Sequence, residues 1–229
     1  MADLPLILVD ELGAQLAGVL DVEGKIPRAL ASLGPLDGRD VVLLDVDGPI
    51  RARQLAELGA RLTLLNAPGR SGTPAPLPVT LDGGTIRVVD GQASLIGPPD
   101  EGFDAVVSCW SSFRDRSDED LVEAERVLRP GGRLLVLHDY GRDDVSRLRG
   151  PDLPEYNAWS RPDGWFLRNG FKIRVIHCWW TFDSIQAATE FLGAAFGASG
   201  SALGQALRRP RLSYNVAIYH RTAGPISQA

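Results

Sequence analysis

Residues 103–108 have the sequence FDAVVS, and residues 121–136 have the sequence LVEAERVLRPGGRLLV. The first run is apolar and typical of a buried strand, whereas the spacing of apolar residues in the second predicts a helix that ends near Leu128. Pro130 cannot continue a helix, and the two glycines after it allow a sharp reversal of the chain. The pattern therefore predicts a strand, a helix, a tight turn and a second strand that begins at Arg133.

The same alternation extends toward the N-terminus. Residues 41–45 form a continuous apolar run that ends in an acid, which is typical of a parallel strand covered by helices on both faces. A helical pattern over residues 52–58 and an apolar run over residues 61–65 complete a strand, helix and strand, about the length of one βαβ unit. With further strands at residues 85–89 and 104–109, the pattern predicts an α/β fold with a doubly wound, mostly parallel sheet.

Helical elements flank this core at both ends of the chain. Apolar residues at helical spacing predict two helices before Gly34-Pro35, so residues 1–37 form an N-terminal helical segment. Residues 38–229 form the Rossmann-like part of what we expect to be a single domain. Its last third is predicted to contain a helix end near residue 169, strands at residues 172–180 and 211–219, and an Ala- and Gly-rich helix at residues 183–207.

Composition excludes several classes of partner. The chain has 229 residues and a formal net charge of −5, whereas nucleic-acid and anionic-membrane binders cluster Lys and Arg against phosphates. No apolar stretch reaches the length of a membrane span, and the N-terminus lacks the basic region of a signal peptide. Cys109 and Cys178 are expected to be buried free thiols, which suits a cytoplasmic protein. The three histidines and two cysteines lack ligand spacing, so no metal site is predicted.

Taken together, three segments resemble a class I S-adenosylmethionine-dependent methyltransferase of the small-molecule, methyltransferase type 11-like kind. They are the strand, helix and Pro-Gly-Gly turn quoted above, the loop Gly91-Gln92-Ala93, and the strands near the C-terminus. The resemblance covers residues 38–220. It implies a Rossmann-like, seven-stranded sheet whose last strand inserts antiparallel between the fifth and sixth.

The resemblance also implies S-adenosylmethionine as cofactor and a loop of alternating glycines after the first strand. Here Asp47, Pro49 and Arg51 stand at those glycine positions. Pro49 has no N–H to donate, and two like charges about 4 Å apart, such as Asp47 and the methionyl carboxylate, cost roughly 1 kcal/mol in water and about 4 kcal/mol at intermediate dielectric. Arg51 could offset part of that cost by pairing with either carboxylate. The residues that the resemblance places at the cofactor are Asp45, Val46, Asp47, Gly48, Asn66, Gln92, Ala93, Ser108 and Cys109.

Each altered position also has a purely structural interpretation. Asp47 and Pro49 are preferred residue types at the start of a helix. Asn66 stands where the family has a ribose-binding acid, and its amide can accept one hydrogen bond and donate another, but Asn is equally common in turns. Gln92 stands where an Asp accepts from the adenine amino group, and Asp90 could reach the same pocket. The pattern indicates a shifted ligand preference or a lost one.

Candidate catalytic groups follow the fifth strand. His138, Asp139 and Tyr140 lie where ligands gather in such folds, and His138 with Asp139 could act as a general base toward a hydroxyl or amine substrate. The alternative is a strand-end His followed by a loop-capping Asp. An aromatic group could form a substrate wall, a dimer surface or simply core; it consists of Trp159, Trp165, Trp179, Trp180 and Phe182.

Two functions therefore compete. The first is a cytoplasmic S-adenosylmethionine-dependent methyltransferase that acts on an unidentified small molecule, with a homodimer as a possible assembly. The second is a non-catalytic protein of the same fold that serves as a binding or scaffold module. A nicotinamide-dependent dehydrogenase is disfavoured, because no Gly-x-Gly-x-x-Gly follows the first strand.

Overall fold

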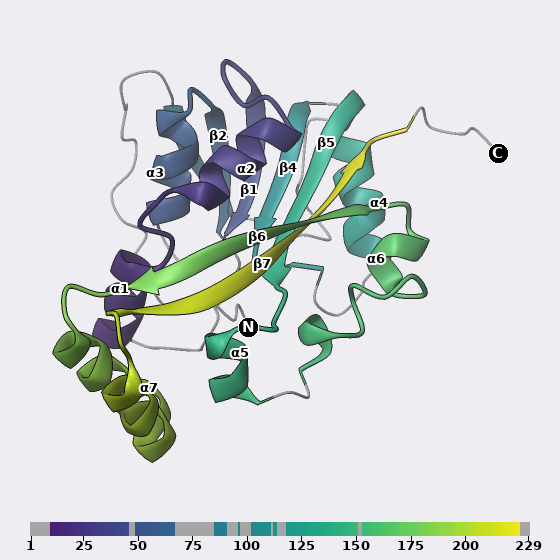
Figure 1. Ribbon diagram of the computed structural model, residues 1–229. Helices are drawn as coiled ribbons and strands as arrows, with labels where there is room; N and C mark the ends of the chain where they lie inside the picture. Colours follow the sequence, from purple (N-terminus) through teal and green to yellow (C-terminus); the bar gives the residue numbers. More distant parts are fainter. Residues whose placement is uncertain are drawn as a thin grey trace.

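A computed structural model of the chain describes residues 10–45, 49–66, 85–90, 96, 102–110, 112–113, 118–150 and 153–224. The elements in chain order are α1 (Asp10–Val19), α2 (Lys25–Leu33), β1 (Asp40–Asp45), α3 (Pro49–Glu57), β2 (Arg61–Asn66), β3 (Thr85–Asp90), β4 (Phe103–Cys109), α4 (Asp118–Val127), β5 (Leu128–Asp139), α5 (Asp144–Arg149), the 3₁₀ turn η1 (Pro154–Tyr156), α6 (Trp165–Arg168), β6 (Lys172–Thr181), α7 (Ile185–Ala206) and β7 (Arg211–Thr222). The predicted α/β class is confirmed (Figure 1).

The strands form one twisted sheet in the order β3-β2-β1-β4-β5-β7-β6. β1 to β5 pair in parallel, whereas β7 pairs antiparallel with both β5 and β6. The predicted antiparallel insertion of the last strand is therefore confirmed. The order reverses between β1 and β4, which makes the carboxyl ends of these two strands the topological switch point of the sheet.

The path of α7 explains why β7 returns antiparallel. Gly197 has φ 65° and ψ −140°, which breaks the helical path, and Figure 1 shows the two halves of α7 folded back on each other. A Cβ on Gly200 would lie 1.9 Å from the Leu192 carbonyl oxygen, and one on Gly204 would lie 2.6 Å from Thr189 Cα. Only glycine permits this approach. The Ala- and Gly-rich composition thus allows α7 to fold into a helical hairpin. The chain therefore leaves α7 close to the end of β6, and β7 runs back beside β6.

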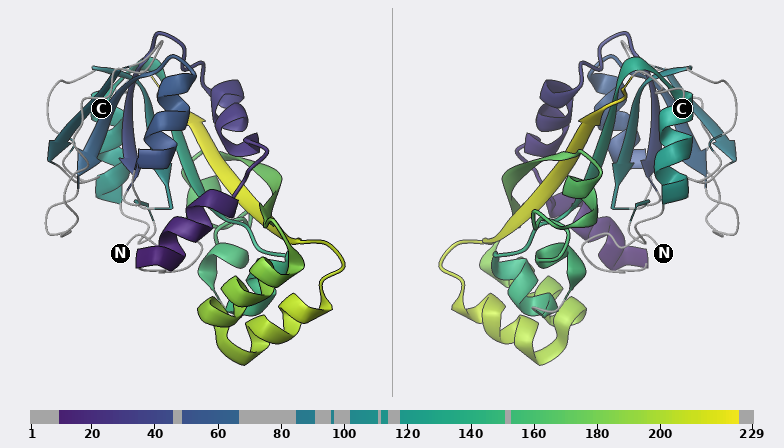
Figure 2. Two further views of the ribbon diagram at one scale, coloured as in Figure 1. Left: turned by 90° about the vertical axis from the view of Figure 1, so that its left-hand side faces the viewer. Right: turned by 90° about the vertical axis from the view of Figure 1, so that its right-hand side faces the viewer.

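Helices cover both faces of the sheet (Figure 2). One apolar layer packs α1, α2, α3, α5 and α7 against the sheet, and the other packs α4 and α6 against the opposite face. The N-terminal segment is fixed at the end of β6, because Leu20 bridges to Trp180 and the Asp21 N–H donates to the Trp179 carbonyl at 3.1 Å. The Asp21 carboxylate also accepts from the Ile26 N–H at 2.7 Å and so satisfies a free donor in the first turn of α2.

The Pro-Gly-Gly segment lies inside β5 and not before it. β5 begins at Leu128, which is earlier than the predicted start at Arg133, and its register with β4 shifts between Phe103 and Ala105. Gly131 has φ 80° and its N–H donates to the Ala223 carbonyl at 3.3 Å, so pairing with the end of β7 keeps this stretch in the sheet. The glycines thus form a bulge in place of the expected free turn.

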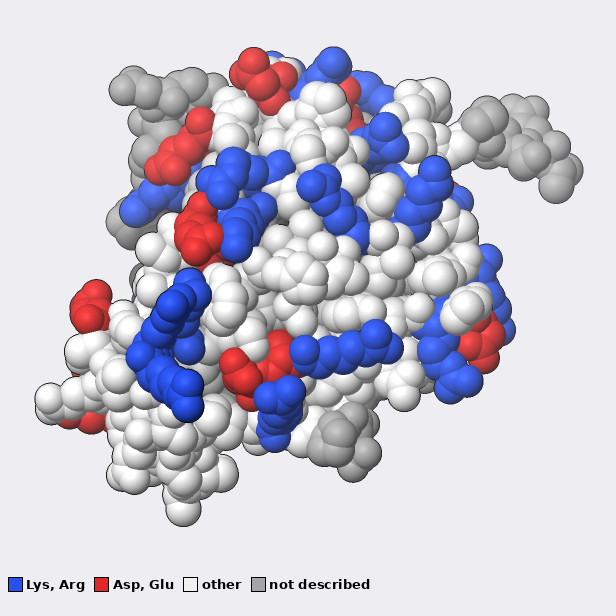
Figure 3. Space-filling model, viewed as in Figure 1, with Lys and Arg blue, Asp and Glu red and all other residues white. Residues whose placement is uncertain are grey.

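Charged side chains are dispersed over the face viewed in Figure 3, where Asp and Glu lie among Lys and Arg. Glu190 is the single charged residue of α7. None of the helices in the described ranges is long and apolar enough to cross a membrane.

Candidate functional site

The switch point of the sheet is the first candidate site. Asp45, at the end of β1, is the register partner of Cys109, at the end of β4, so the chain leaves both strands at the same edge. Ligands of open α/β sheets bind in the crevice outside such strand ends. α3 begins at Pro49, close after β1, so its first turn lies near this edge of the sheet.

Arg51 and Trp110 are in contact near the ends of β1 and β4. The Arg51 guanidinium carbon lies 5.3 Å from the centroid of the Trp110 ring, and Arg51 Nη1 donates to Gln54 Oε1 at 2.8 Å. Both side chains are buried, with 9% of Arg51 and 2% of Trp110 exposed. A cation on the face of a Trp ring is stabilised by about 1 kcal/mol or more when water is excluded. The position where the family has its third glycine therefore carries a buried positive charge.

The backbone at Trp110 departs from the usual region. Trp110 has φ 50° and Phe113 has φ 66°, and a bulky residue with positive φ costs on the order of 1–3 kcal/mol. The Trp110 N–H donates to the Leu137 carbonyl at 2.8 Å, which extends the β4–β5 pairing by one residue. The Ser112 N–H donates to Ser108 Oγ at 3.1 Å and closes the turn. Such strain persists where surrounding contacts hold it, most often at ligand sites.

The predicted cofactor residues are only partly described. Asp45 and Asn66 end β1 and β2, and Asn66 is the register partner of Asp90 at the end of β3, so these three backbone positions share one edge. The side chains of these residues lie outside what the structure describes. Val46, Asp47, Gly48, Gln92 and Ala93 lie outside the described residues altogether, so their predicted convergence remains a prediction.

Ser108 and Cys109 are both completely buried. Cys109 faces the apolar layer under α1, α2 and α3, whereas Ser108 Oγ is hydrogen-bonded within the turn after β4. Cys178 is also a buried free thiol, as predicted, and burial raises its pKa to about 12. A thiol held in its neutral form this firmly is a poor nucleophile at neutral pH.

His138 and Asp139 do not form the expected dyad. Successive residues of a strand point to opposite faces. The His138 ring packs 4.7 Å from the Trp159 ring, in the layer under α4 and α6, whereas Asp139 accepts a hydrogen bond from Trp110 in the other layer. Tyr140 lies beyond the strand, with the Arg142 guanidinium 5.5 Å from its ring. The predicted shared acid–base role of His138 and Asp139 is therefore wrong, because the two side chains lie on opposite faces of the sheet. A separate role for each residue remains a prediction.

Asp139 instead belongs to a buried polar cluster. Its Oδ1 accepts from Trp110 Nε1 at 2.8 Å and from the Tyr214 hydroxyl, and its Oδ2 accepts from Arg149 Nη1. Arg149 Nη2 lies 3.7 Å from Glu155 Oε1. Burial raises the pKa of Asp139 to about 6, because the charged form loses its hydration; Arg149 and the two hydrogen bonds oppose this shift. The cluster therefore holds the Trp110 indole in place.

α5 brings Arg149 to this cluster, and this short helix was not predicted from the sequence. The Asp143 carboxylate accepts from the Ser146 N–H at 2.7 Å, and the Asp143 N–H donates to Ser146 Oγ at 3.1 Å, which completes a capping box. The second Asp143 oxygen accepts from the Asn215 N–H at 2.7 Å, so the cap also ties α5 to β7. The Asp-x-x-Ser spacing was the available signal.

The predicted aromatic group does not form one wall. Trp159 and Trp165 lie in the layer under α4 and α6, and Trp180 and Phe182 lie in the opposite layer. The Arg211 guanidinium carbon lies 4.3 Å from the centroid of the Trp179 ring and stacks on it. The core interpretation is therefore the correct one for four of these five residues. In the described part of the chain no group of three or more His, Cys, Asp or Glu could hold a metal ion.

Comparisons with known proteins agree with this architecture. No family model matches the chain. A segment is 47% identical over 57 residues to the ubiquinone/menaquinone biosynthesis C-methyltransferase UbiE of Hahella chejuensis, covering 24% of this chain and 22% of that protein. A segment is 46% identical over 55 residues to the demethylmenaquinone methyltransferase of Deinococcus radiodurans, covering 23% and 22%. The chain thus spans about a fifth of the length of the curated relatives it matches.

Solved structures are similar over nearly the whole chain. A type II methyltransferase from Anaeromyxobacter dehalogenans has a TM-score of 0.57 at 17% identity, covering 88% of this chain and 97% of that one. A methyltransferase from an antibiotic biosynthesis pathway of Anabaena variabilis has a TM-score of 0.55 at 14% identity, covering 89% and 99%. At such identities the likeness establishes architecture, while function depends on the site. The chain has the class I S-adenosylmethionine-dependent methyltransferase fold.

Proposed function

We propose that this protein is an S-adenosylmethionine-dependent methyltransferase that acts on a small molecule. The observation that carries the proposal is the sheet order, with β7 antiparallel between β5 and β6 and the switch point at β1 and β4. The segment identity of 46–47% to two methyltransferases of quinone biosynthesis supports the same activity. The acceptor and the predicted homodimer and cytoplasmic location stay predictions from the sequence.

The charge at the switch point fits the methionyl end of this cofactor. A guanidinium presents parallel N–H donors to a carboxylate, and the buried site strengthens such a bond. Arg51 is the residue that would hold the carboxylate, by exchanging its neutral partner Gln54 for a charged one. In this proposal the side chain takes over the task that backbone N–H groups of a glycine loop perform in the family. The cofactor supplies a methyl group on a positively charged sulfur.

The remaining residues of the site act by position. Trp110 is buried between Arg51 and Asp139, so its ring would shield the Arg51 guanidinium from water. Asp139, Arg149 and Tyr214 fix the indole, so we assign Asp139 a positioning role and not a catalytic one. Methyl transfer is an in-line displacement, and holding the reactants in line supplies much of the rate.

The same contact favours a second candidate, a non-catalytic protein of this fold. Arg51 over Trp110 fills space that a glycine would leave open, and Pro49 removes one N–H donor from the start of α3. If the Arg51 side chain closes the crevice, the fold serves as a binding or scaffold module.

Isothermal titration of S-adenosylmethionine and S-adenosylhomocysteine into the full chain separates the two candidates. The methyltransferase proposal expects a micromolar Kd for at least one of them, together with a rise in Tm at saturating ligand. No heat and no thermal shift at millimolar ligand would overturn it and favour the scaffold.

A further inference from the structure

A group of positively charged side chains lies on the sheet face that α2 partly covers, away from the switch point. Arg133 lies near the start of β5, and Lys172 and Arg174 lie at the start of β6. β7 ends beside them, because Arg133 is the register partner of Thr222 and Lys172 is the register partner of His220. Figure 3 shows Lys and Arg side chains where β6 and β7 cross this face. The group therefore lies near the sheet edge opposite the carboxyl ends of β1 and β4.

The register of the three strands brings these side chains together. His220 on β7 is directly opposite Lys172 on one side and Leu135 on the other, so all three side chains point to the same face. Directly opposite residues have Cβ atoms about 5 Å apart, and diagonal neighbours lie about 7–8 Å apart. Arg133 and Arg174 are the diagonal neighbours of His220, in opposite directions along β7. Three cations thus surround one histidine within the reach of a single small ligand.

The described partners of the two arginines are neutral hydroxyl groups. Arg174 Nη1 donates to Ser32 Oγ at 2.6 Å, and Arg133 Nη1 donates to Thr222 Oγ1. Each bond uses one of the five N–H donors of a guanidinium and fixes the side chain without neutralising its charge. Among the described residues, no carboxylate forms an ion pair with Arg133, Lys172 or Arg174. The remaining donors are therefore available to an anion.

The three charges act together at His220. Burial and the positive charges of Arg133, Lys172 and Arg174 lower the pKa of His220. The imidazole is therefore neutral at neutral pH and carries one N–H donor. Of the neighbouring elements, β5 and β6 supply the cations, and the last turn of α2 supplies the neutral Ser32. An anion at this place would be attracted by three charges at once.

We propose that Arg133, Lys172, Arg174 and His220 form a binding site for a small molecule that carries a diphosphate group. The two arginines lie on opposite sides of the Lys172–His220 pair, so the cations match two linked phosphoryl groups better than a single phosphate. A planar guanidinium binds phosphate oxygens through parallel N–H donors. The inference concerns binding alone and stands independently of the proposed function.

Calorimetric titration of inorganic pyrophosphate and of phosphate into the full chain at low ionic strength tests the charge match. Pyrophosphate should bind with a Kd of about 1 mM or lower and about tenfold more tightly than phosphate, because it meets cations on both sides of His220. Added sodium chloride should weaken the binding, since the cations are exposed to solvent. No heat with pyrophosphate, or equal affinities for the two anions, would overturn the proposal.

Variants locate the binding. K172Q and R174Q should each weaken pyrophosphate binding about fivefold, because each removes one positive charge from the site. The matched control is R168Q, which removes the same charge from an exposed position of α6 on the opposite face of the sheet and should have no effect. If R168Q weakens binding as much as R174Q does, the attraction comes from net charge and the site assignment is wrong.

A second readout uses the wild-type chain alone. Pyrophosphate beside His220 should raise the pKa of its imidazole, because the anion offsets the neighbouring cations. Proton NMR of the imidazole ring measures this shift. His177 serves as the internal reference, because alternation along β6 places it on the face opposite Arg174. An unchanged pKa of His220 at saturating pyrophosphate, or equal shifts at both histidines, would contradict the proposed site.

Discussion

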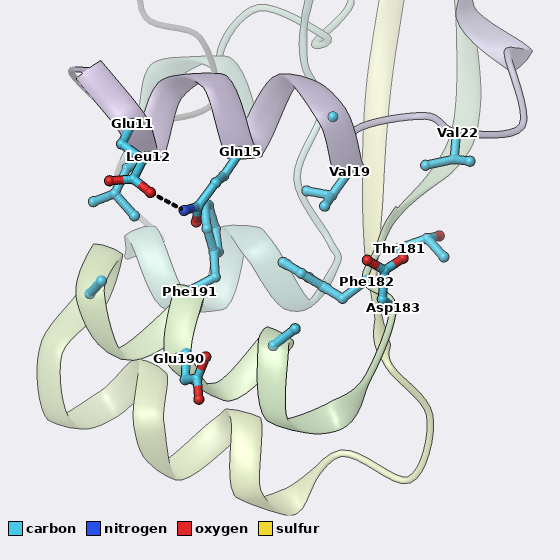
Figure 4. Close-up of a pocket in the computed structure, with 13 residues that line it drawn as sticks. Glu11, Leu12, Gln15, Val19, Val22, Thr181, Phe182, Asp183, Glu190 and Phe191 are labelled. Atoms are coloured by element: carbon cyan, nitrogen blue, oxygen red, sulfur yellow. Dashed lines mark hydrogen bonds between the residues drawn. The ribbon is translucent and has the colours of Figure 1, made fainter.

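The buried cluster around Asp139 and the pocket between α1 and α7 both contain carboxylates, but the carboxylates in the two places have different kinds of hydrogen-bond partner. In the cluster, Asp139 is 3% exposed and accepts from a guanidinium, an indole and a phenol of the same chain. The pocket (Figure 4) has a volume of about 840 Å³, and among its lining residues Glu11 and Glu190 are exposed and accept from the side-chain amides of Gln15 and Gln186. A buried carboxylate needs partners within the chain, and these partners stabilise the fold, whereas an exposed carboxylate is hydrated and needs no ion pair.

Removing the Arg149 guanidinium from the cluster should lower the free energy of unfolding more than any other change considered below. R149M leaves Asp139 and Glu155 buried without their partner, and breaking a buried pair costs about 3–5 kcal/mol of unfolding free energy. Urea denaturation measures the loss. R147M is the control on the same helix, because its side chain is 79% exposed, and it should change stability by less than about 0.5 kcal/mol. Equal effects of both variants would show that the cluster does not hold the fold.

A somewhat smaller effect is expected on how the unfolding free energy depends on pH, because Asp139 titrates in the cluster. Burial raises the pKa of Asp139 from 3.8 to about 6, so the folded state binds more protons than the unfolded state between these values. Stability from this group is therefore complete below pH 4 and is lost as pH rises through about 6. The unfolding free energy of the wild type relative to D139N should fall by roughly 2–3 kcal/mol over this window. A flat difference from pH 4 to pH 7 would contradict the burial of an ionisable Asp139.

A smaller effect is expected at the switch point. Asp47 stands at a glycine position of the family and would repel the methionyl carboxylate. D47G should therefore tighten binding of S-adenosylhomocysteine by about tenfold, measured by calorimetry. Unchanged or weaker affinity would show that the Asp47 side chain does not face the ligand.

The smallest effect on folding should come from the pocket. The double variant D183N/E190Q removes two exposed like charges that have no described ion pair, so its unfolding free energy should lie within about 0.5 kcal/mol of the wild type. Thermal unfolding at low and high salt measures this. A loss of 2 kcal/mol or more, on the scale of buried groups, would place these acids with the structural charges.

Local patterns predicted much of the fold but little of its long-range pairing. Continuous apolar runs located β1, β2 and β4, because strands buried on both faces need apolar residues at successive positions. α5 was missed because six residues are too few for a helical period, although Asp143 and Ser146 carry a capping signature. The Pro-Gly-Gly bulge was predicted as a free turn because the partner that extends it, Ala223, lies far along the chain.

The site was harder to predict than the fold for the same reason. The partners of Asp139 come from positions 110, 149 and 214, which meet only because β7 inserts beside β5. Alternation along β5 separated His138 from Asp139, although neighbours in sequence suggested a pair. Trp179 and Trp180 are separated in the same way on β6. Arg51 was recognised as a possible counter-charge, but its contact with Trp110 required the strand order.

One calorimetric comparison tests whether Arg51 holds the methionyl carboxylate of the cofactor. S-adenosylhomocysteine and 5′-methylthioadenosine, which lacks the methionyl carboxylate, are titrated into the wild type, R51M and the exposed α3 control R53M. We expect R51M to lose about tenfold or more in affinity for S-adenosylhomocysteine and to keep its affinity for 5′-methylthioadenosine, whereas R53M should match the wild type. Equal or tighter binding of S-adenosylhomocysteine by R51M would contradict this expectation, because the guanidinium would then close the crevice and not hold the ligand.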